Sequence, residues 1–293
     1  MKKAYLYAGG AIFFWSTAAT VSKILLRELN NIQLLWMNSL WAGVFLLVLN
    51  IALGNFKKHK DYTVNDYLVM AAISIPATVL YYVFYYAGTD ILPASQAFII
   101  NYLWPIMSLI FACVILKEKL TAKKIIAILI SFFGVIVVVG GDLGNFDRQM
   151  LFGALYCILG AISYGLYTAL SKKMPYDKMM TLMVGYFIAF IFTTVLNFVR
   201  GDLFIPAANQ ILGFAWSGIF TAATANTCWA LAIANGKTEK ISNLAYITPF
   251  LSIVWTAVFL REEIGVNSLL GLGNIVFGII MQLKKTEKTE SAG

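Results

Sequence analysis

Charge is scarce in this chain. Only 12% of its 293 residues are Asp, Glu, Lys or Arg, whereas a soluble domain has about 25%. Apolar residues make up 60%, and the mean hydropathy is +0.78. These values exclude an ordinary cytosolic enzyme, and the aromatic content of 15% excludes a disordered chain. The composition predicts an integral membrane protein.

Residues that bind metals or form disulfides are few as well. Cys113, Cys157 and Cys228 lie in apolar stretches without CxxC spacing, which argues against a disulfide framework or a zinc site. The single histidine, His59, lies in a basic loop, where a solvated role is favoured over a catalytic one. A membrane-embedded transferase would need clustered Asp, or His with a carboxylate. We therefore predict no enzyme, metal or cofactor, and keep a membrane-embedded enzyme and a receptor-like protein as remote alternatives.

Ten apolar stretches, each about as long as the 20 residues that a transmembrane helix needs, account for nearly the whole chain. All fourteen acidic residues lie outside them, as expected because an ionised carboxylate in hydrocarbon is costly. We predict an all-α membrane protein with ten transmembrane helices. The stretches are 5–26, 34–53, 67–87, 93–116, 124–141, 151–171, 180–199, 212–234, 242–260 and 267–283.

The basic residues predict the orientation. Seventeen of the 22 Lys and Arg residues lie in the amino-terminal segment, in alternate loops and after the last stretch, and only four lie in the other loops. Basic residues near a membrane stay on the cytoplasmic side, so both termini are predicted to be cytoplasmic. The net charge of +8 then reflects topology, and we predict no nucleic-acid partner.

The two halves of the chain resemble each other. An offset of 144 residues pairs Tyr102 with Tyr246, Pro105 with Pro249, Ser108 with Ser252 and Glu118 with Glu262, and an offset of 149 pairs Ser22-Lys23 with Ser171-Lys172. Each predicted repeat contains five helices. Because five is an odd number, the second repeat begins on the opposite side of the membrane from the first. We predict repeats at 1–141 and 142–283 and a disordered cytoplasmic tail at 284–293. Inverted repeats are typical of alternating-access transporters.

Polar and aromatic side chains inside the apolar stretches predict a substrate cavity. Pro105 and Pro249 should kink their helices and act as hinges. Polar residues share a helical face with each proline, which favours a cavity, although contacts between helices remain an alternative. For the asparagines, an interhelical hydrogen bond is nearly as favoured as substrate contact. The cavity candidates are Trp15, Tyr81, Tyr85, Asn101, Trp104, Ser108, Tyr164, Asn226, Trp229, Tyr246, Thr248 and Ser252.

Three charged residues near the ends of stretches are candidates for gate or structural roles. Lys23 is expected to reach the outer lipid headgroups, with a role in meeting a substrate's charge as the alternative. Glu118 and Glu262 are expected to pair with nearby Lys119, Lys123 or Arg261, or to accept hydrogen bonds from the free amides of the next helix.

The paired Pro-x-x-Ser…Leu-(Lys/Arg)-Glu segments, in a chain with five spans in each half, resemble the drug/metabolite transporter superfamily and its EamA branch. The resemblance covers nearly the whole chain. It implies a central cavity built from helices 1, 3, 4, 6, 8 and 9, with helices 5 and 10 at the periphery. It also implies a bacterial cytoplasmic-membrane protein that exports amino acids or other small metabolites.

One departure from the wider superfamily bears on the substrate. The related four-helix multidrug transporters carry a glutamate inside their first helix, whereas this chain has Trp15 in that region and no acid. We therefore expect a neutral or zwitterionic substrate, such as an aromatic or large neutral amino acid, and keep a cation or drug exporter as the alternative. The expected partners are a small molecule and the lipid bilayer. The oligomeric state stays open, and a monomer is compatible with the sequence.

Overall fold

The computed structural model describes residues 2–140, 148–235, 241 and 244–283, and these residues form helices and short connections without a strand. The predicted repeat boundary at 141–142 and the predicted tail at 284–293 lie outside them. Each of the ten predicted apolar stretches falls on helix over most of its described residues. The all-helical prediction is therefore confirmed for the described part of the chain.

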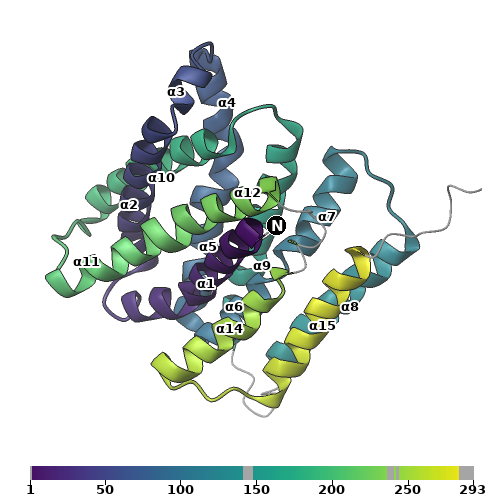
Figure 1. Cartoon of the computed structure of the whole chain (residues 1–293). Coiled ribbons are helices and arrows are strands. Elements are labelled where there is room, and N and C mark those ends of the chain that lie inside the picture. The colour runs from purple at the N-terminus through teal and green to yellow at the C-terminus, as the bar shows by residue number, and fades with distance from the viewer. Residues whose placement is uncertain (1, 141–147, 236–240, 242–243, 284–293) are drawn as a thin grey trace, which may run out of the picture.

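The helices of the first half follow one another with short connections (Figure 1). They are α1 (Lys2–Leu25), α2 (Asn31–Ala52), the short α3 (Asn55–Lys58), α4 (Val64–Ile75), the π-helical segment η1 (Pro76–Leu80), α5 (Tyr81–Ile91), α6 (Ala94–Asn101), α7 (Trp104–Ile115) and α8 (Ala122–Gly140).

The second half contains a similar succession. Its described helices are α9 (Arg148–Lys173), α10 (Lys178–Arg200), α11 (Ala208–Ala215), η3 (Trp216–Thr224), α12 (Ala225–Asn235), α14 (Ile247–Trp255), η4 (Thr256–Leu260) and α15 (Val266–Leu283). The π segments η1 and η3 continue the helices on either side of them. At η1 the widening follows from Pro76, which has no N–H for the ladder of helical hydrogen bonds.

Local sequence sets where the long helices begin and end. The Asn30 side chain accepts hydrogen bonds from the Ile32 and Gln33 amides and starts α2, and Asp177 accepts one from the Met180 amide and starts α10. Gly201 ends α10 in the left-handed conformation, with φ of +72°. These caps satisfy amide groups that a helix end otherwise leaves free.

Six helical segments of the described part are long and apolar enough to cross a membrane, with shorter apolar helices at 247–260 and 266–281. Large apolar side chains face outward on several of them, among them Phe133 of α8, Phe198 of α10 and Phe277 of α15. An exposed apolar surface of this kind suits contact with lipid. The chain is therefore a multi-pass integral membrane protein.

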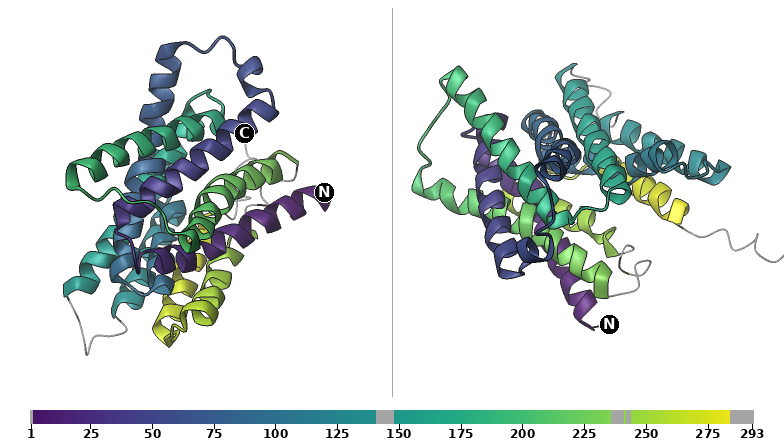
Figure 2. Two further views of the ribbon diagram at one scale, coloured as in Figure 1. Left: turned by 90° about the vertical axis from the view of Figure 1, so that its left-hand side faces the viewer. Right: turned by 90° about the horizontal axis from the view of Figure 1, so that it is seen from above.

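The helices pack into a central group with one pair at its side. α9 packs against α5, α6 and α7, and α1 packs against α12 and α14; Figure 2 shows α1 and α12 side by side. α8 and α15 pack closely on each other and lie at one side of the molecule (Figure 1). Gly134 permits this contact, because a Cβ there would lie 2.7 Å from the Gly271 carbonyl oxygen.

Candidate functional site

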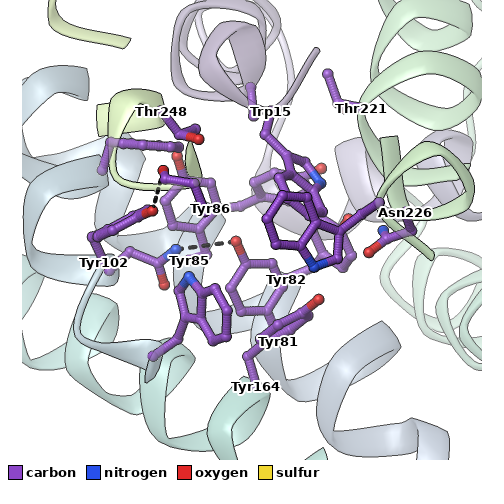
Figure 3. Close-up of a pocket in the computed structure, with 16 residues that line it drawn as sticks. Trp15, Tyr81, Tyr82, Tyr85, Tyr86, Tyr102, Tyr164, Thr221, Asn226 and Thr248 are labelled. Atoms are coloured by element: carbon purple, nitrogen blue, oxygen red, sulfur yellow. Dashed lines mark hydrogen bonds between the residues drawn. The ribbon is translucent and has the colours of Figure 1, made fainter. Parts of the chain in front are cut away.

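A cavity lined mainly by aromatic rings lies among α1, α5, α6, α7, α9, α12 and α14 (Figure 3). We call one part of this cavity the aromatic pocket, with a volume of about 100 Å³. The pocket is lined by Trp15, Ala18, Tyr81, Tyr82, Tyr85, Tyr86, Phe98, Asn101, Tyr102, Trp104, Tyr164, Thr221, Asn226, Trp229, Ala245 and Thr248.

A roomier part of about 420 Å³, which we call the vestibule, adjoins the aromatic pocket. The two share Trp15, Trp104, Tyr164, Asn226 and Trp229, so they are parts of one cavity. The vestibule extends to Ser171 near the end of α9 and to Lys178 at the start of α10. A solute in the vestibule would therefore reach the aromatic pocket past these five side chains.

Nine of the twelve predicted cavity residues line this cavity. They are Trp15, Tyr81, Tyr85, Asn101, Trp104, Tyr164, Asn226, Trp229 and Thr248. They come from helices far apart in sequence, and the fold brings them together. Their contact with a substrate remains a prediction.

The other three predicted residues lie outside the cavity lining. Ser108 belongs to the contact between α7 and α9, where a Cβ on Gly165 would lie 2.7 Å from the Ser108 amide nitrogen. Ser252 is fully buried, and Tyr246 packs against the apolar core that contains Tyr102. A shared helical face therefore did not suffice to place these three side chains in the cavity.

Several lining residues were not among the candidates. Tyr82 and Tyr86 directly follow Tyr81 and Tyr85 on α5, and the sequence could not show that all four would line one cavity. Tyr102 could have been predicted, because it is the repeat counterpart of Tyr246, which was a cavity candidate. Lys178 could not, since a lysine beside a helix start is typical of any membrane-facing loop.

Polar contacts order the wall of the aromatic pocket. Asn101 Nδ2 donates to Tyr81 Oη at 3.0 Å, and Tyr102 Oη donates to the Ala245 carbonyl oxygen at 2.5 Å (Figure 3). Tyr85 Oη and Thr248 Oγ1 are buried and make no hydrogen bond within the described part of the chain. A buried polar atom without a partner is costly, so these two atoms are candidates to bind polar groups of a solute.

Among the described residues, the cavity lining contains no Asp, Glu or His, and Lys178 in the vestibule is its one charged residue. No group of His, Cys, Asp and Glu suited to a metal ion occurs among the described residues. This arrangement provides aromatic faces and uncharged hydrogen-bonding groups. It suits the binding of a small organic solute.

Pro105 and Pro249, the predicted kink and hinge residues, each lie just after an interruption of the helix, and their role as hinges stays a prediction. α6 ends at Asn101 and α7 begins at Trp104, which places Pro105 in the first turn of α7. Pro249 likewise lies in the first turn of α14, after a turn at residues 245–246. The first turn tolerates proline because its amides have no helical partner there.

Lys23 lies at one end of the molecule and bonds to backbone carbonyl oxygens, and its contact with lipid headgroups stays a prediction. Its Nζ donates to the carbonyl oxygens of Thr89, Asp90 and Leu92, at 2.6, 2.8 and 2.8 Å. These carbonyls lie at and just after the end of α5, where the helix dipole favours a positive charge.

Glu262 completes the same end. Its two carboxylate oxygens accept the amides of Ala94 and Ser95 at 2.6 and 3.0 Å, in the first turn of α6. These amides belong to α6, whereas the sequence suggested the amides of the following helix, α15. We call this region, with Lys23, Glu262 and residues 89–95, the Lys23 end.

Glu118 lies at the other end of the α6–α7 segment. We call this end, with Glu118, Lys124 and Lys172, the Lys172 end. Glu118 forms ion pairs with Lys172 at 3.1 Å and Lys124 at 3.3 Å, two partners that the sequence did not suggest. The hydrogen bond from Lys172 is the largest cause that lowers the pKa of Glu118, and Lys124 acts in the same direction. The residues before the two glutamates, Lys117 and Arg261, both adopt the left-handed conformation, with φ of 57° and 56°.

The comparisons with known proteins agree with this architecture. The model of the EamA-like transporter family matches residues 2–140 and again residues 151–283. An uncharacterized transporter of Clostridium kluyveri is 28% identical over 100% of this chain and 99% of its own length. The aromatic amino acid exporter YddG of Ancylobacter novellus is 24% identical over 61% of this chain and 63% of its own.

The fold is also found in a solved structure. A crystal structure of a protein with 20% sequence identity matches with a TM-score of 0.66 and covers 96% of each chain. At this identity the likeness establishes the fold alone. The family model, in contrast, matches both halves and most of the chain. The chain therefore belongs to the EamA-like transporter family.

Proposed function

We propose that this protein moves small organic metabolites across the bacterial cytoplasmic membrane by alternating access. In this proposal the chain has ten transmembrane segments in two inverted repeats, and both termini are cytoplasmic. The Lys23 end then faces outward and the Lys172 end faces the cytoplasm. The cavity is the substrate path, and its aromatic pocket is the binding site.

The observation that carries the proposal is that the described lining of the cavity extends to Ser171 and Lys178 at the Lys172 end and includes no residue of the Lys23 end. Ser171 lines the vestibule at the Lys172 end, whereas its repeat counterpart Ser22, at the Lys23 end, is only 2% exposed. Leu92, Ala94 and Ser95 beside it are also buried. A site reached from one side at a time is the requirement of alternating access, and inverted repeats supply it by exchanging conformations.

We propose amino acids with aromatic or large apolar side chains as the substrates, moved out of the cell. The aromatic pocket provides ring faces for such a side chain. Tyr85 Oη and Thr248 Oγ1 supply uncharged polar atoms, and Lys178 in the vestibule attracts a carboxylate. The similarity to an aromatic amino acid exporter supports this choice.

A cation or drug exporter is the second candidate. Ring faces of Trp and Tyr attract cations, which favours this reading of the pocket. The described residues of the cavity lining include no carboxylate to neutralise a cation, however, which favours a neutral or zwitterionic solute. The two candidates predict different substrates in the same assay.

Counterflow in proteoliposomes tests the proposal. Vesicles are loaded with unlabelled tryptophan, phenylalanine, leucine, glutamate or tetramethylammonium, and labelled solute of the same kind is added outside. We expect transient accumulation of label for the first three. Accumulation of tetramethylammonium alone would favour the second candidate. If solutes bind but none of them accumulates, the transport function would be contradicted.

Two variants connect the transport to the cavity. Trp15→Ala removes a ring that both parts of the cavity share, and we expect at least a tenfold loss of counterflow. Phe133→Ala is the matched control, because Phe133 is 57% exposed on α8, outside the cavity. Equal rates in both variants, at equal amounts of folded protein, would remove Trp15 from the substrate site.

A further inference from the structure

The two helix breaks have equivalent chemistry in the two repeats. Proline has no N–H, so Pro105 cannot bond the Asn101 carbonyl and Pro249 cannot bond the Ala245 carbonyl, four residues earlier. These two carbonyls are counterparts at the offset of 144 residues, as are Tyr102 and Tyr246. Each break therefore combines a carbonyl released by proline with a tyrosine one residue later.

In this structure one of the two carbonyls is bonded across the repeats. The Ala245 carbonyl accepts the Thr248 amide at 3.0 Å and the Tyr102 hydroxyl at 2.5 Å (Figure 3). Tyr102 is 5% exposed, and it reaches from the break between α6 and α7 to the break before α14. This hydrogen bond joins the first half of the chain to the second at the cavity wall.

The reciprocal hydrogen bond is not made. Tyr246 Oη has no hydrogen-bond partner in the described part of the chain, although Tyr246 packs against the core that contains Tyr102. α14, which begins directly after Tyr246, also packs against α6, which ends at Asn101. The two tyrosines thus occupy equivalent positions in the repeats, and within the described part of the chain only the Tyr102 hydroxyl has a hydrogen-bond partner.

We propose that Tyr102 and Tyr246 form a switch that exchanges one hydrogen bond for the other during transport. The bond from Tyr102 to the Ala245 carbonyl stabilises the state that is closed at the Lys23 end. In the state that is closed at the Lys172 end, it is replaced by a bond from Tyr246 to the Asn101 carbonyl. This inference rests on the proposed alternating access, because exchange of conformations between inverted repeats converts each contact into its counterpart.

Phenylalanine substitutions test the switch, because each removes one hydroxyl and keeps the ring. Cys113, Cys157 and Cys228 are first replaced by alanine, and Ser22→Cys or Ser171→Cys is added as a probe. These probes are repeat counterparts, one buried at the Lys23 end and one in the vestibule. The measured quantity is the ratio of maleimide labelling rates at Ser22→Cys and Ser171→Cys.

Tyr102→Phe should raise this ratio about three- to tenfold, the effect expected for one neutral hydrogen bond on an equilibrium. Tyr246→Phe should lower it by a similar factor, because it removes a bond only from the other state. Tyr156→Phe on α9, outside the cavity lining, is the matched control and should leave the ratio unchanged.

Two outcomes would overturn the switch: both variants change the ratio in the same direction, or neither changes it while the protein remains folded. The labelling needs no substrate. A failure of the proposed transport function would instead appear as absent counterflow of the unsubstituted protein. The two failures are therefore distinguishable.

Discussion

The two ends of the molecule contain matched charged residues with different partners. At the Lys23 end, Lys23 donates to three backbone carbonyls and Glu262 accepts two backbone amides, all within residues 89–95. At the Lys172 end, the counterparts Lys172 and Glu118 pair with each other at 3.1 Å. The first set joins α1 and the segment after η4 to the connection between α5 and α6, whereas the second is a solvent-exposed ion pair.

The difference shows how one set of residues serves two conformations. A charge that bonds to buried helix ends contributes more than an exposed ion pair, because solvent screens the exposed pair. We infer that backbone contacts of Lys23 and Glu262 stabilise a closed end. At an open end, the counterpart residues Lys172 and Glu118 then neutralise each other's charge instead. Substitutions at one end, with the counterpart residue at the other end as the control, test this difference.

The largest effect is expected from Lys23→Met. This substitution keeps an apolar stem but removes three charge-assisted hydrogen bonds, each of which contributes about 1.5–3 kcal/mol. Labelling of the Ser22→Cys probe should rise at least about tenfold. Lys172→Met is the control, and it should change labelling less than about fivefold because an exposed pair contributes at most about 1 kcal/mol. Equal effects of the two variants would contradict the comparison.

A smaller change is expected from Glu262→Gln. Glutamine keeps one oxygen that can accept the Ala94 or Ser95 amide, but it loses the negative charge at the start of α6. Labelling of Ser22→Cys should rise about three- to fivefold, and Glu118→Gln should have little effect on it. If Glu118→Gln raised labelling of Ser22→Cys as strongly, the capping of α6 by Glu262 would not be the reason for the rise.

The prolines should act in opposite directions. Pro249→Ala restores an N–H that competes with Tyr102 for the Ala245 carbonyl, so it should raise the labelling ratio of Ser22→Cys to Ser171→Cys about two- to threefold. Pro105→Ala restores the N–H facing the Asn101 carbonyl and should lower the ratio. Changes in the same direction would argue against the exchange between repeats.

The smallest effect concerns the pH dependence at the Lys172 end. The pKa of Glu118 is lowered mainly by the hydrogen bond from Lys172, so the ionised carboxylate stabilises the folded protein above its ordinary pKa. This contribution is lost as the pH falls through the lowered pKa. The melting temperature of the unsubstituted protein should exceed that of Glu118→Gln by a few degrees at most near pH 7.

The difference between these two proteins should disappear on acidification below the lowered pKa. Both are measured in the same detergent, so that its contribution cancels. A stability difference that grows as the pH falls would contradict the assigned ion pairs. A difference that is the same across the whole pH range would point to packing instead of charge.

Local patterns predicted much of the helical fold. The exclusion of acids marked the apolar stretches, and the matched Pro105 and Pro249 identified the two places where helices break. Nine cavity residues, among them Trp15 and Tyr164, could be found because aromatic and polar side chains inside apolar stretches are conspicuous. Ser252 and Ser108 followed the same pattern but lie in helix contacts, since helical spacing does not specify which neighbour covers a face.

The contacts at the Lys23 end could not be predicted from the sequence. Lys23 contacts carbonyls 66 to 69 residues away, and Glu262 contacts amides 167 and 168 residues away, so both depend on tertiary packing. In the proposed mechanism the same sequence also adopts a second state with these contacts released. A single sequence cannot indicate which state a structure will show.

The most direct test of alternating access follows the two matched probes together. Ser22→Cys and Ser171→Cys are labelled in the otherwise unsubstituted cysteine-free protein and in the Lys23→Met, Pro249→Ala and Tyr102→Phe backgrounds. The account predicts that labelling at Ser22→Cys rises whenever labelling at Ser171→Cys falls. Labelling that rises at both positions in the same variant would contradict it, because the cavity would then be open at both ends at once.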